Sequence, residues 1–156
     1  MLNPYIVLFL FNLEIAFPFG NSGVIDIDHE NTNQTGTQKE NADSHVESIF
    51  REIESGLLKG DVSTFSQYFG KQVSVSLHGA ETGTFSSNQT FYILQNYFTM
   101  MRLANFSFST VHTTKDTPFA TGGGTIVKKG KREIVQIYVS LVKQDRKWVV
   151  TQFNVY

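Results

Sequence analysis

Apolar residues in the middle of the chain recur at the spacing of an α-helix. Ser44 and Glu47 form a capping-box pattern, so this helix is predicted to begin at Ser44. Lys59 lies in its predicted last turn, and Gly60 suits the left-handed position that follows a helix. The residues at i, i+3, i+4, i+7 and i+11, which share one face, are Val46, Ile49, Phe50, Ile53 and Leu57.

Two further helices are predicted after Gly60. Asp61 is a plausible N-cap for a short second helix that ends at Gly70, with a shared face of Val62, Phe65, Tyr68 and Phe69. Ser86 and Gln89 form a second capping pair, which predicts a third helix. Its apolar stripe is Phe91, Leu94, Phe98 and Met101.

The other segments alternate between apolar and polar residues, as strands do. A strand is predicted around 73–77, a turn or hairpin at 78–87, and four consecutive strands at 106–112, 119–128, 133–143 and 147–156. Three glycines at 122–124 interrupt one of them and predict a bulge or a sharp bend. This order predicts an α+β fold in which about three helices cover one face of an antiparallel sheet.

The first 43 residues have a different character. Residues 1–20 contain the apolar run Tyr5–Phe11, which is too short for a stable membrane span and resembles the apolar part of a secretory signal. No Lys or Arg precedes this run and Glu14 follows it, so an apolar terminus or a buried strand is the alternative. Residues 21–43 are polar and acidic and are interpreted as a disordered linker. We therefore expect an exported, periplasmic or extracellular protein with one domain at 44–156.

Residues 44–156 resemble a known superfamily. The segments that carry the resemblance are "IFREIESGLLKGDVSTFSQYF", "VSVSL" and "GGGTIV…EIVQIYVSLVKQDRKWVVTQFNVY". In this order they are similar to the nuclear transport factor 2-like, or cystatin-like cone, superfamily, and most to an exported bacterial group known as domain of unknown function 4783. The resemblance implies a curved sheet wrapped around helices. The superfamily includes isomerases, dehydratases, transport adaptors and proteins without known activity, so the fold alone does not assign a function.

Several kinds of chemistry have no support in the sequence. The chain has no cysteine, which excludes disulfides, thiolate metal ligands and a cysteine nucleophile. It has neither a Gly-x-Ser-x-Gly nor a phosphate-loop pattern, and we expect no metal and no cofactor. No acidic residue after Ser44 falls on a predicted apolar stripe, which argues against a proton-transfer enzyme. An isomerase- or dehydratase-like enzyme with His112 or His78 as its base remains the alternative.

The register of the last two strands predicts a ligand site. If opposite residues sum to 291, Gln152 and Asn154 share the apolar face that points toward the helices. Together with Tyr68 and His112 they are the candidate ligand-binding residues, in a cavity for a small apolar molecule. Structural hydrogen bonding of the two amides is the alternative, because most side-chain hydrogen bonds go to the backbone or to water.

Charge and surface patterning suggest the remaining partners. Seven of the 13 Lys and Arg residues lie between Lys128 and Lys147, at two predicted turns. Lys and Arg at turns often serve to keep sheet edges soluble and unpaired, and we prefer this explanation to an anionic partner. No aromatic–basic motif indicates nucleic-acid binding. The outer face of the sheet, predicted to carry Tyr138, Ser140, Thr151 and Phe153, is a candidate homodimer interface. The leading hypothesis is an exported non-enzymatic binding module, and a dimeric scaffold is a further alternative.

Overall fold

The computed structural model describes residues 33–113, 116–128 and 130–156, with side chains from Asp43 onward. No helix in this part of the chain combines the length and hydropathy needed to cross a membrane. The elements, in order, are α1 (Asn33–Lys59), the 3-10 turns η1 (Val62–Thr64) and η2 (Ser66–Tyr68), β1 (Phe69–Leu77), β2 (Thr82–Ser86), α2 (Ser87–Met100), β3 (Arg102–His112), β4 (Phe119–Lys128), β5 (Lys131–Gln144) and β6 (Lys147–Val155).

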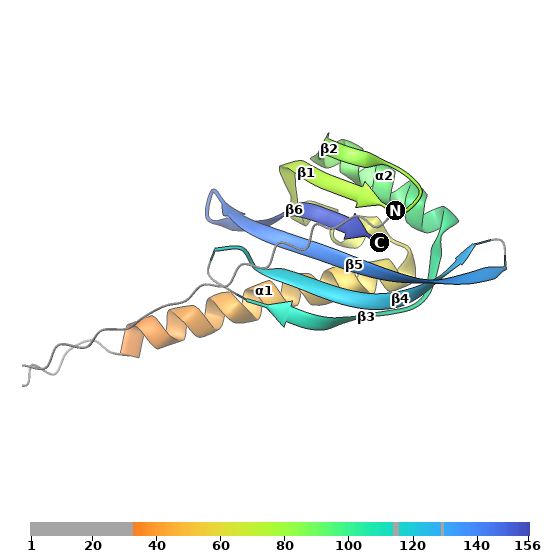
Figure 1. The fold of residues 1–156 in the computed structure, drawn as a ribbon. Helices are drawn as coiled ribbons and strands as arrows, with labels where there is room; N and C mark the ends of the chain where they lie inside the picture. The colour runs from red at the N-terminus through yellow and green to blue at the C-terminus, as the bar shows by residue number, and fades with distance from the viewer. Residues whose placement is uncertain (1–32, 114–115, 129) are drawn as a thin grey trace, which may run out of the picture. The chain divides into compact units, whose positions relative to one another are not determined.

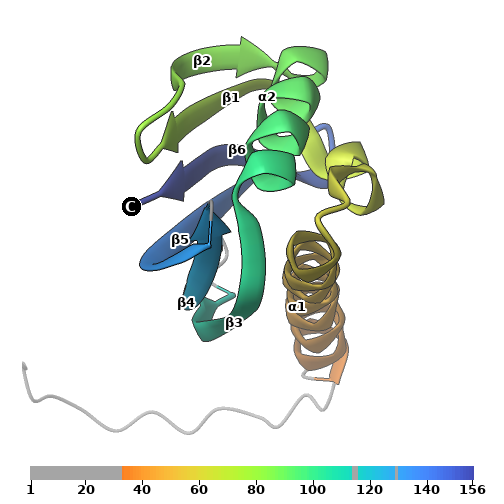
Figure 2. The ribbon, with the colours of Figure 1, turned by 90° about the vertical axis from the view of Figure 1, so that its right-hand side faces the viewer.

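The described strands form one curved sheet in the order β2-β1-β6-β5-β4-β3 (Figure 1). Both α-helices lie on the same side of this sheet, which we call its inner face (Figure 2). The predicted α+β class is therefore confirmed, but the sheet is mixed because β1 and β6 run parallel. Alternation of apolar and polar residues indicates strands and their faces. It does not indicate whether a strand pairs parallel or antiparallel with another strand that is distant in sequence.

The long helix α1 begins earlier than the sequence pattern predicts and ends where it predicts. It starts at Asn33 instead of Ser44, so residues 33–43 are helical, while residues 1–32 lie outside the described part. Good helix formers such as Gln, Lys, Glu and Ala at positions 38–42 are compatible with this extension. At the other end Gly60 has φ +67°. The Gly60 N–H donates to Leu57 O (3.1 Å) and the Asp61 N–H to Gly56 O (2.9 Å), a Schellman motif.

The predicted second helix is wrong in type. Asp61 accepts a hydrogen bond from the Ser63 N–H (3.0 Å) as expected of a cap, but the chain then makes two 3-10 turns. Phe65, at φ −125° and ψ 0°, interrupts helical geometry between them. Val, Ser, Thr and Phe are weak helix formers, so burial of Val62 and Phe65 decides the local backbone. The third predicted helix is confirmed as α2, with the Ser86–Gln89 capping box in place.

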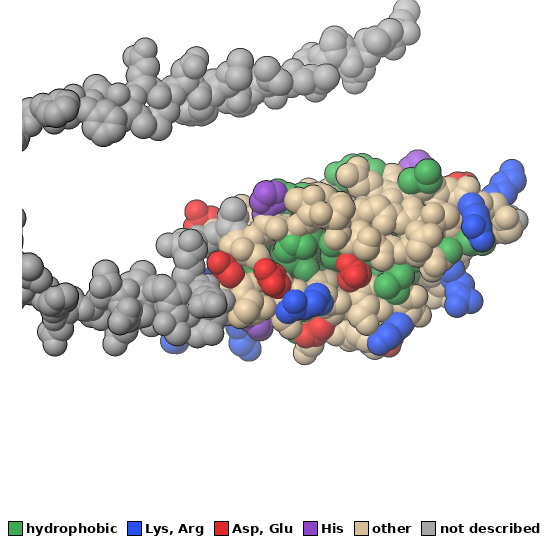
Figure 3. Space-filling view, turned by 90° about the horizontal axis from the view of Figure 1, so that it is seen from below, with side chains coloured by type: hydrophobic (Ala, Val, Ile, Leu, Met, Phe, Trp, Pro, Cys, Tyr) green, Lys and Arg blue, Asp and Glu red, His purple; other side chains and the backbone are tan. Residues whose placement is uncertain are grey.

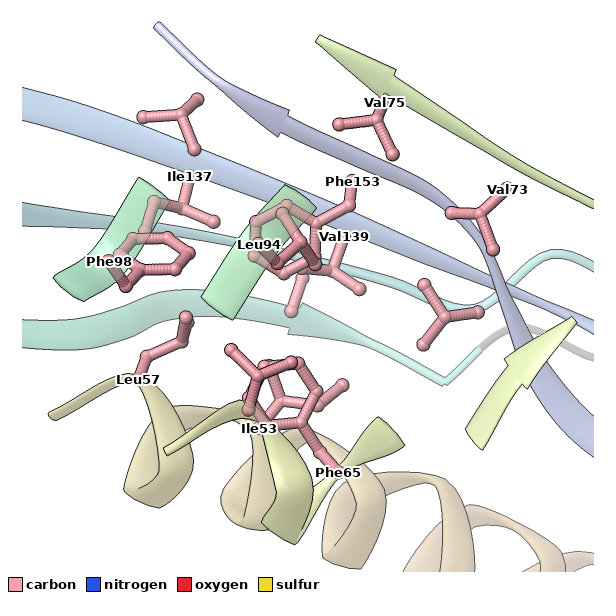
Figure 4. Close-up of a cluster of buried hydrophobic side chains, with 14 of the residues drawn as sticks. Ile53, Leu57, Phe65, Val73, Val75, Leu94, Phe98, Ile137, Val139 and Phe153 are labelled. Carbon is pink, nitrogen blue, oxygen red and sulfur yellow. The ribbon is translucent and has the colours of Figure 1, made fainter. Parts of the chain in front are cut away.

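Aromatic and branched side chains fill the space between the helices and the inner face (Figure 4). Phe153 lies at the centre, with its ring 6.5 Å from Phe65 and 6.1 Å from Phe98, centroid to centroid. All three are essentially inaccessible to water. Each ring buries roughly 150–250 Å². Around Phe153, the interior is filled by the protein's own core side chains.

The register of β5 and β6 corrects one prediction for the site. Leu141 pairs with Val150, which matches the predicted sum, but the pairing shifts by one residue between Ser140 and Leu141. Beyond the shift Val139 pairs with Phe153, so Phe153 enters the core. Gln152 and Asn154 consequently lie on the outer face, opposite to their predicted position. A bulge reverses which residues face the core, and alternation cannot locate it in advance.

The glycine run in β4 allows a close approach of β3. A Cβ added at Gly122 would clash with the backbone of Ser107 and Phe108, whereas one at Gly123 would have only Val135 O, at 4.0 Å, in reach. The β3–β4 register shifts on both sides of this region, between Leu103 and Asn105 and between Phe108 and Thr110. The irregularity lies in β3, which has one extra residue at each shift, whereas the glycine-containing strand β4 pairs with β5 without a break.

We expect Gly122→Ala to destabilise the fold by about 1–3 kcal/mol, because the added methyl group has no free space. Gly123→Ala is the matched control and should change the free energy of unfolding by less than about 0.5 kcal/mol. Urea denaturation of both variants measures the difference. Equal stability of the two variants would contradict this account of the close approach between β3 and β4.

Candidate functional site

A groove of about 290 Å³ lies between α1 and the edge strand β3. Figure 3 views this side of the molecule and shows apolar side chains with acidic and basic ones around them. The groove is lined by Glu47, Phe50, Arg51, Glu54, Phe108 and Val111. Its volume is near the lower end of the range for small-molecule sites, about 300–1,000 Å³.

The helical repeat explains why one flank of α1 lines the groove. Positions 47, 50, 51 and 54 follow the i, i+3, i+4, i+7 spacing of one helix face. Phe50, at 2% exposure, forms the floor, with its ring edge-on to Phe108 at 5.8 Å. Val111 is 41% exposed and leaves the apolar part of the groove open to solvent.

Glu54 connects the helix to the edge of the sheet. Its Oε2 accepts a hydrogen bond of 2.7 Å from the backbone N–H of Phe108. Because β3 pairs with β4 on one side only, this N–H has no strand partner there, and the carboxylate satisfies it. The bond therefore fixes β3 at the distance from α1 that defines the groove.

The rim of the groove is charged. Arg51 forms an exposed ion pair with Glu47, with 3.8 Å between Nη1 and Oε2. Pairs of this kind contribute little to stability, so both groups remain available to a ligand. With Glu54, the groove presents two carboxylates and one guanidinium beside an apolar floor. This arrangement can hold an apolar group that carries a positive charge, by contact and by charge complementarity.

Tyr68 lies on the opposite flank of α1. Its hydroxyl donates a hydrogen bond of 2.9 Å to Glu52 Oε2. Burial, followed by the hydrogen bond and the charge of Glu52, raises the pKa of Tyr68 above its ordinary value. Glu52 and Glu54 are two positions apart, about 200° around the helix. Tyr68 therefore does not line the groove, although the sequence groups it with the ligand-binding candidates.

The other three candidates meet on the outer face of the sheet. His112 pairs with Phe119, Phe119 with Ser140, and Ser140 with Gln152, across four adjacent strands. The His112 ring lies 4.5 Å from that of Phe119. Asn154, on the same face, donates from Nδ2 to the Tyr156 hydroxyl at 2.9 Å. The structure thus brings His112, Gln152 and Asn154 to one face, away from both the interior and Tyr68.

The two histidines do not have the positions that the histidine-based enzyme hypothesis requires. It required His112 or His78 inside an open pocket, but both side chains are exposed and neither lines the groove. Among the described residues, no three His, Cys, Asp or Glu side chains are grouped so as to hold a metal ion.

The sequence pattern does not single out the groove residues Glu47, Arg51, Glu54, Phe108 and Val111. The available signal was the spacing of 47, 50, 51 and 54 beside the core stripe of the helix. It could not identify a site, because the facing surface comes from β3, more than fifty residues later. Only the tertiary contact between Glu54 and Phe108 reveals it.

Comparisons with known proteins agree with this fold. The model of the family described as "Domain of unknown function (DUF4783)" matches residues 50–155. A member of that family from Bacteroides uniformis is similar in structure, with a TM-score of 0.61, 11% identity, and coverage of 67% of this chain and 93% of that one. An NTF2-like protein of unknown function from Pseudomonas putida has a TM-score of 0.57 and 13% identity, with 74% and 86% covered.

A protein from Bacillus subtilis described as a candidate isomerase is also similar, with a TM-score of 0.58 and 12% identity. The match covers 74% of this chain and 87% of that one. A comparison with curated proteins finds no match. At these identities the likeness establishes the nuclear transport factor 2-like fold and not an activity.

Proposed function

The chain belongs to the DUF4783 family, and for this member we propose the function of an exported, non-enzymatic binding module. Its binding site is the groove between α1 and β3. The observation that carries the proposal is the combination, in one groove, of an apolar floor with the charged side chains of Glu47, Arg51 and Glu54. The ligand is a small molecule or ligand group with an apolar body.

Packing favours the groove over the interior as the binding site. The inner face is lined by fully buried side chains that already contact one another, so a ligand there would have to displace core residues. Displacement of well-packed apolar groups costs several kcal/mol. In the groove, by contrast, Val111 is partly exposed, and a ligand would remove its apolar surface from water at little cost.

Charge narrows the ligand class. Two carboxylates and one guanidinium give the groove a net negative charge, so a cationic group beside the apolar body is favoured over an anionic one. This preference should be modest, because the groove is open and water screens its charges.

The groove is tested with three probes of one shape and different charge: benzylamine, benzyl alcohol and benzoate. We expect amide chemical-shift changes at 47–54 and 108–111 in NMR spectra, largest for benzylamine and smallest for benzoate. Val111→Asn should abolish these changes because it removes apolar lining.

Leu58→Asn is the matched control, because Leu58 is also on the surface, 44% exposed, but does not line the groove. It should bind the probes as the wild type does. Equal losses in both variants, or shifts spread over other elements, would contradict the assignment of the site.

Export is the second part of the proposal. It rests on the apolar run Tyr5–Phe11, followed by polar residues, which resembles a secretory signal. We expect the protein recovered from the exported fraction of its own cells to lack this run when its intact mass is measured. An intact mass that includes Met1, or recovery from the cytoplasm alone, would contradict export.

A second candidate function, a dimeric scaffold, is supported by the outer face of the sheet. Its three central cross-strand rows contain no Lys, Arg, Asp or Glu. They consist of Thr84, Ser74, Gln152, Ser140, Phe119 and His112; Thr82, Ser76, Asn154, Tyr138, Thr121 and Thr110; and Tyr156, Gln136, Gly123 and Ser107.

Such a face could meet a second copy without repulsion between like charges, and charge depletion is typical of interface centres. Strand spacings imply an area on the order of 600 Å². A standard interface needs about 800 Å² per partner, so the area is near that size.

Light scattering across a concentration series tests this second candidate. We expect a dimer that Thr121→Arg converts to a monomer, since it places a charge at the centre of the face. Asn96→Arg, on an exposed position of α2, is the control and should leave the dimer intact. A wild-type monomer at the highest concentration would contradict the dimer.

A further inference from the structure

The end of the β4–β5 hairpin carries an unusual arrangement of charge. Lys128 and Lys131 lie directly opposite each other as its last cross-strand pair. Like charges in directly opposite positions destabilise a hairpin. Residues that reduce local stability often occur at functional sites, so this pair of lysines points to a role other than stabilising the fold.

Two arginines add positive charge on the other side of this hairpin end, which is the outer face. Val127 pairs with Arg102 of β3 on one side and with Arg132 of β5 on the other. The two arginine positions are therefore two strand spacings apart, about 10 Å. Within the described part of the chain, neither guanidinium has an ion-pair partner. Both are exposed and free to bind an external anion.

An exposed apolar side chain lies in the next row of the same face. Ile134 pairs with Thr125, which in turn pairs with Asn105. Ile134 is 90% exposed, the highest value among the large apolar residues described as exposed. A β-branched apolar residue suits a strand, but a side chain that is almost fully exposed is not stabilised by burial in this molecule. Beside two unpaired arginines it forms a mixed basic and apolar surface.

The nearest acidic residue does not neutralise this surface. Glu133 lies between Arg132 and Ile134 in sequence, so its side chain points to the opposite face of the strand. There it faces Tyr97: burial raises the pKa of Tyr97 above its ordinary value, and the charge of Glu133 adds to this rise. The outer side of the hairpin end therefore presents Arg102, Arg132 and Ile134 without an opposing carboxylate from their own strands.

We propose that the outer side of this hairpin end, defined as Arg102, Arg132 and Ile134, docks onto an anionic lipid bilayer. Lys128 and Lys131 lie on the opposite side of the same tip and add to its positive charge. The two guanidinium groups bind headgroup phosphates, and Ile134 enters the apolar side of the interface. Exposed charge alone would fit any polyanion, but only a bilayer also offers an apolar phase to Ile134. The proposal does not depend on the ligand groove, which lies between other residues.

The test measures partition of the full chain between buffer and vesicles by co-sedimentation. Vesicles with about 30% phosphatidylglycerol in phosphatidylcholine are compared with pure phosphatidylcholine. At roughly one kcal/mol per basic residue near an anionic surface, Arg102→Gln combined with Arg132→Gln should weaken partition into anionic vesicles about thirtyfold. Ile134→Ser should weaken it by about tenfold.

The β5–β6 hairpin offers a charge-matched control. Arg146→Gln combined with Lys147→Gln removes the same formal charge from exposed positions at another turn. It should weaken partition less than about threefold. Equal losses in the two double variants would mean that net charge alone drives binding, and would overturn the proposal.

A local probe separates the hairpin from the rest of the chain, including the apolar run Tyr5–Phe11. Because the chain has no cysteine, Ile134→Cys carries one environment-sensitive dye at a defined place. Its emission should shift to the blue on anionic vesicles, while the same dye on Gln144→Cys should not shift. Sedimentation without a blue shift at 134 would overturn the proposal.

The last experiment compares the vesicles with a soluble polyanion. Inorganic polyphosphate should neither shift the dye at 134 to the blue nor distinguish wild type from Ile134→Ser. If polyphosphate instead competed fully with vesicles and Ile134→Ser bound vesicles as well as wild type, the hairpin would be a polyanion site and the lipid assignment would be wrong.

Discussion

The contact between Glu54 and the edge strand β3 is the constraint on which the candidate site depends. An edge strand presents unpaired backbone groups, and proteins must cover or satisfy them. Here the Glu54 carboxylate accepts the Phe108 N–H, and the rings of Phe50 and Phe108 pack beneath this bond. One interaction therefore protects the sheet edge and sets the width of the groove. Removal of the carboxylate would leave a partly buried N–H without an acceptor.

The close approach of β3 to β4 places the other partner of this contact. Gly122 lets the backbone of β3 approach closely, and register shifts on both sides increase the local curvature. The curved sheet then surrounds an interior that Phe65, Phe98 and Phe153 fill. The proposed functions consequently lie on three surfaces: the groove, the uncharged outer face and the basic hairpin end. Each uses different residues, so variants can separate their roles.

Local structure could largely be predicted from the sequence, because local patterns determine it. The inner face of α1, the left-handed Gly60 and the Ser86–Gln89 capping box each depend on neighbouring residues. The two 3-10 turns were missed because burial of Phe65 overrides helical spacing there. The bulge in the β5–β6 hairpin leaves no sign in the alternation, and its one-residue shift moved Gln152 and Asn154 to the outer face. The mixed sheet depends on the pairing of β1 with β6, which are distant in sequence. The groove escaped prediction for the same reason, since its two walls are brought together by the fold.

Hydrogen exchange at the Phe108 amide tests the central claim most directly. In the wild type this amide should exchange as slowly as its neighbours that bond to β4. Glu54→Ala should accelerate exchange by about ten- to a hundredfold, in line with the usual strength of hydrogen bonds to charged groups. Glu47→Ala, at the exposed rim, should have no such effect. Fast exchange at Phe108 in the wild type, or equal rates in the wild type and Glu54→Ala, would contradict the account.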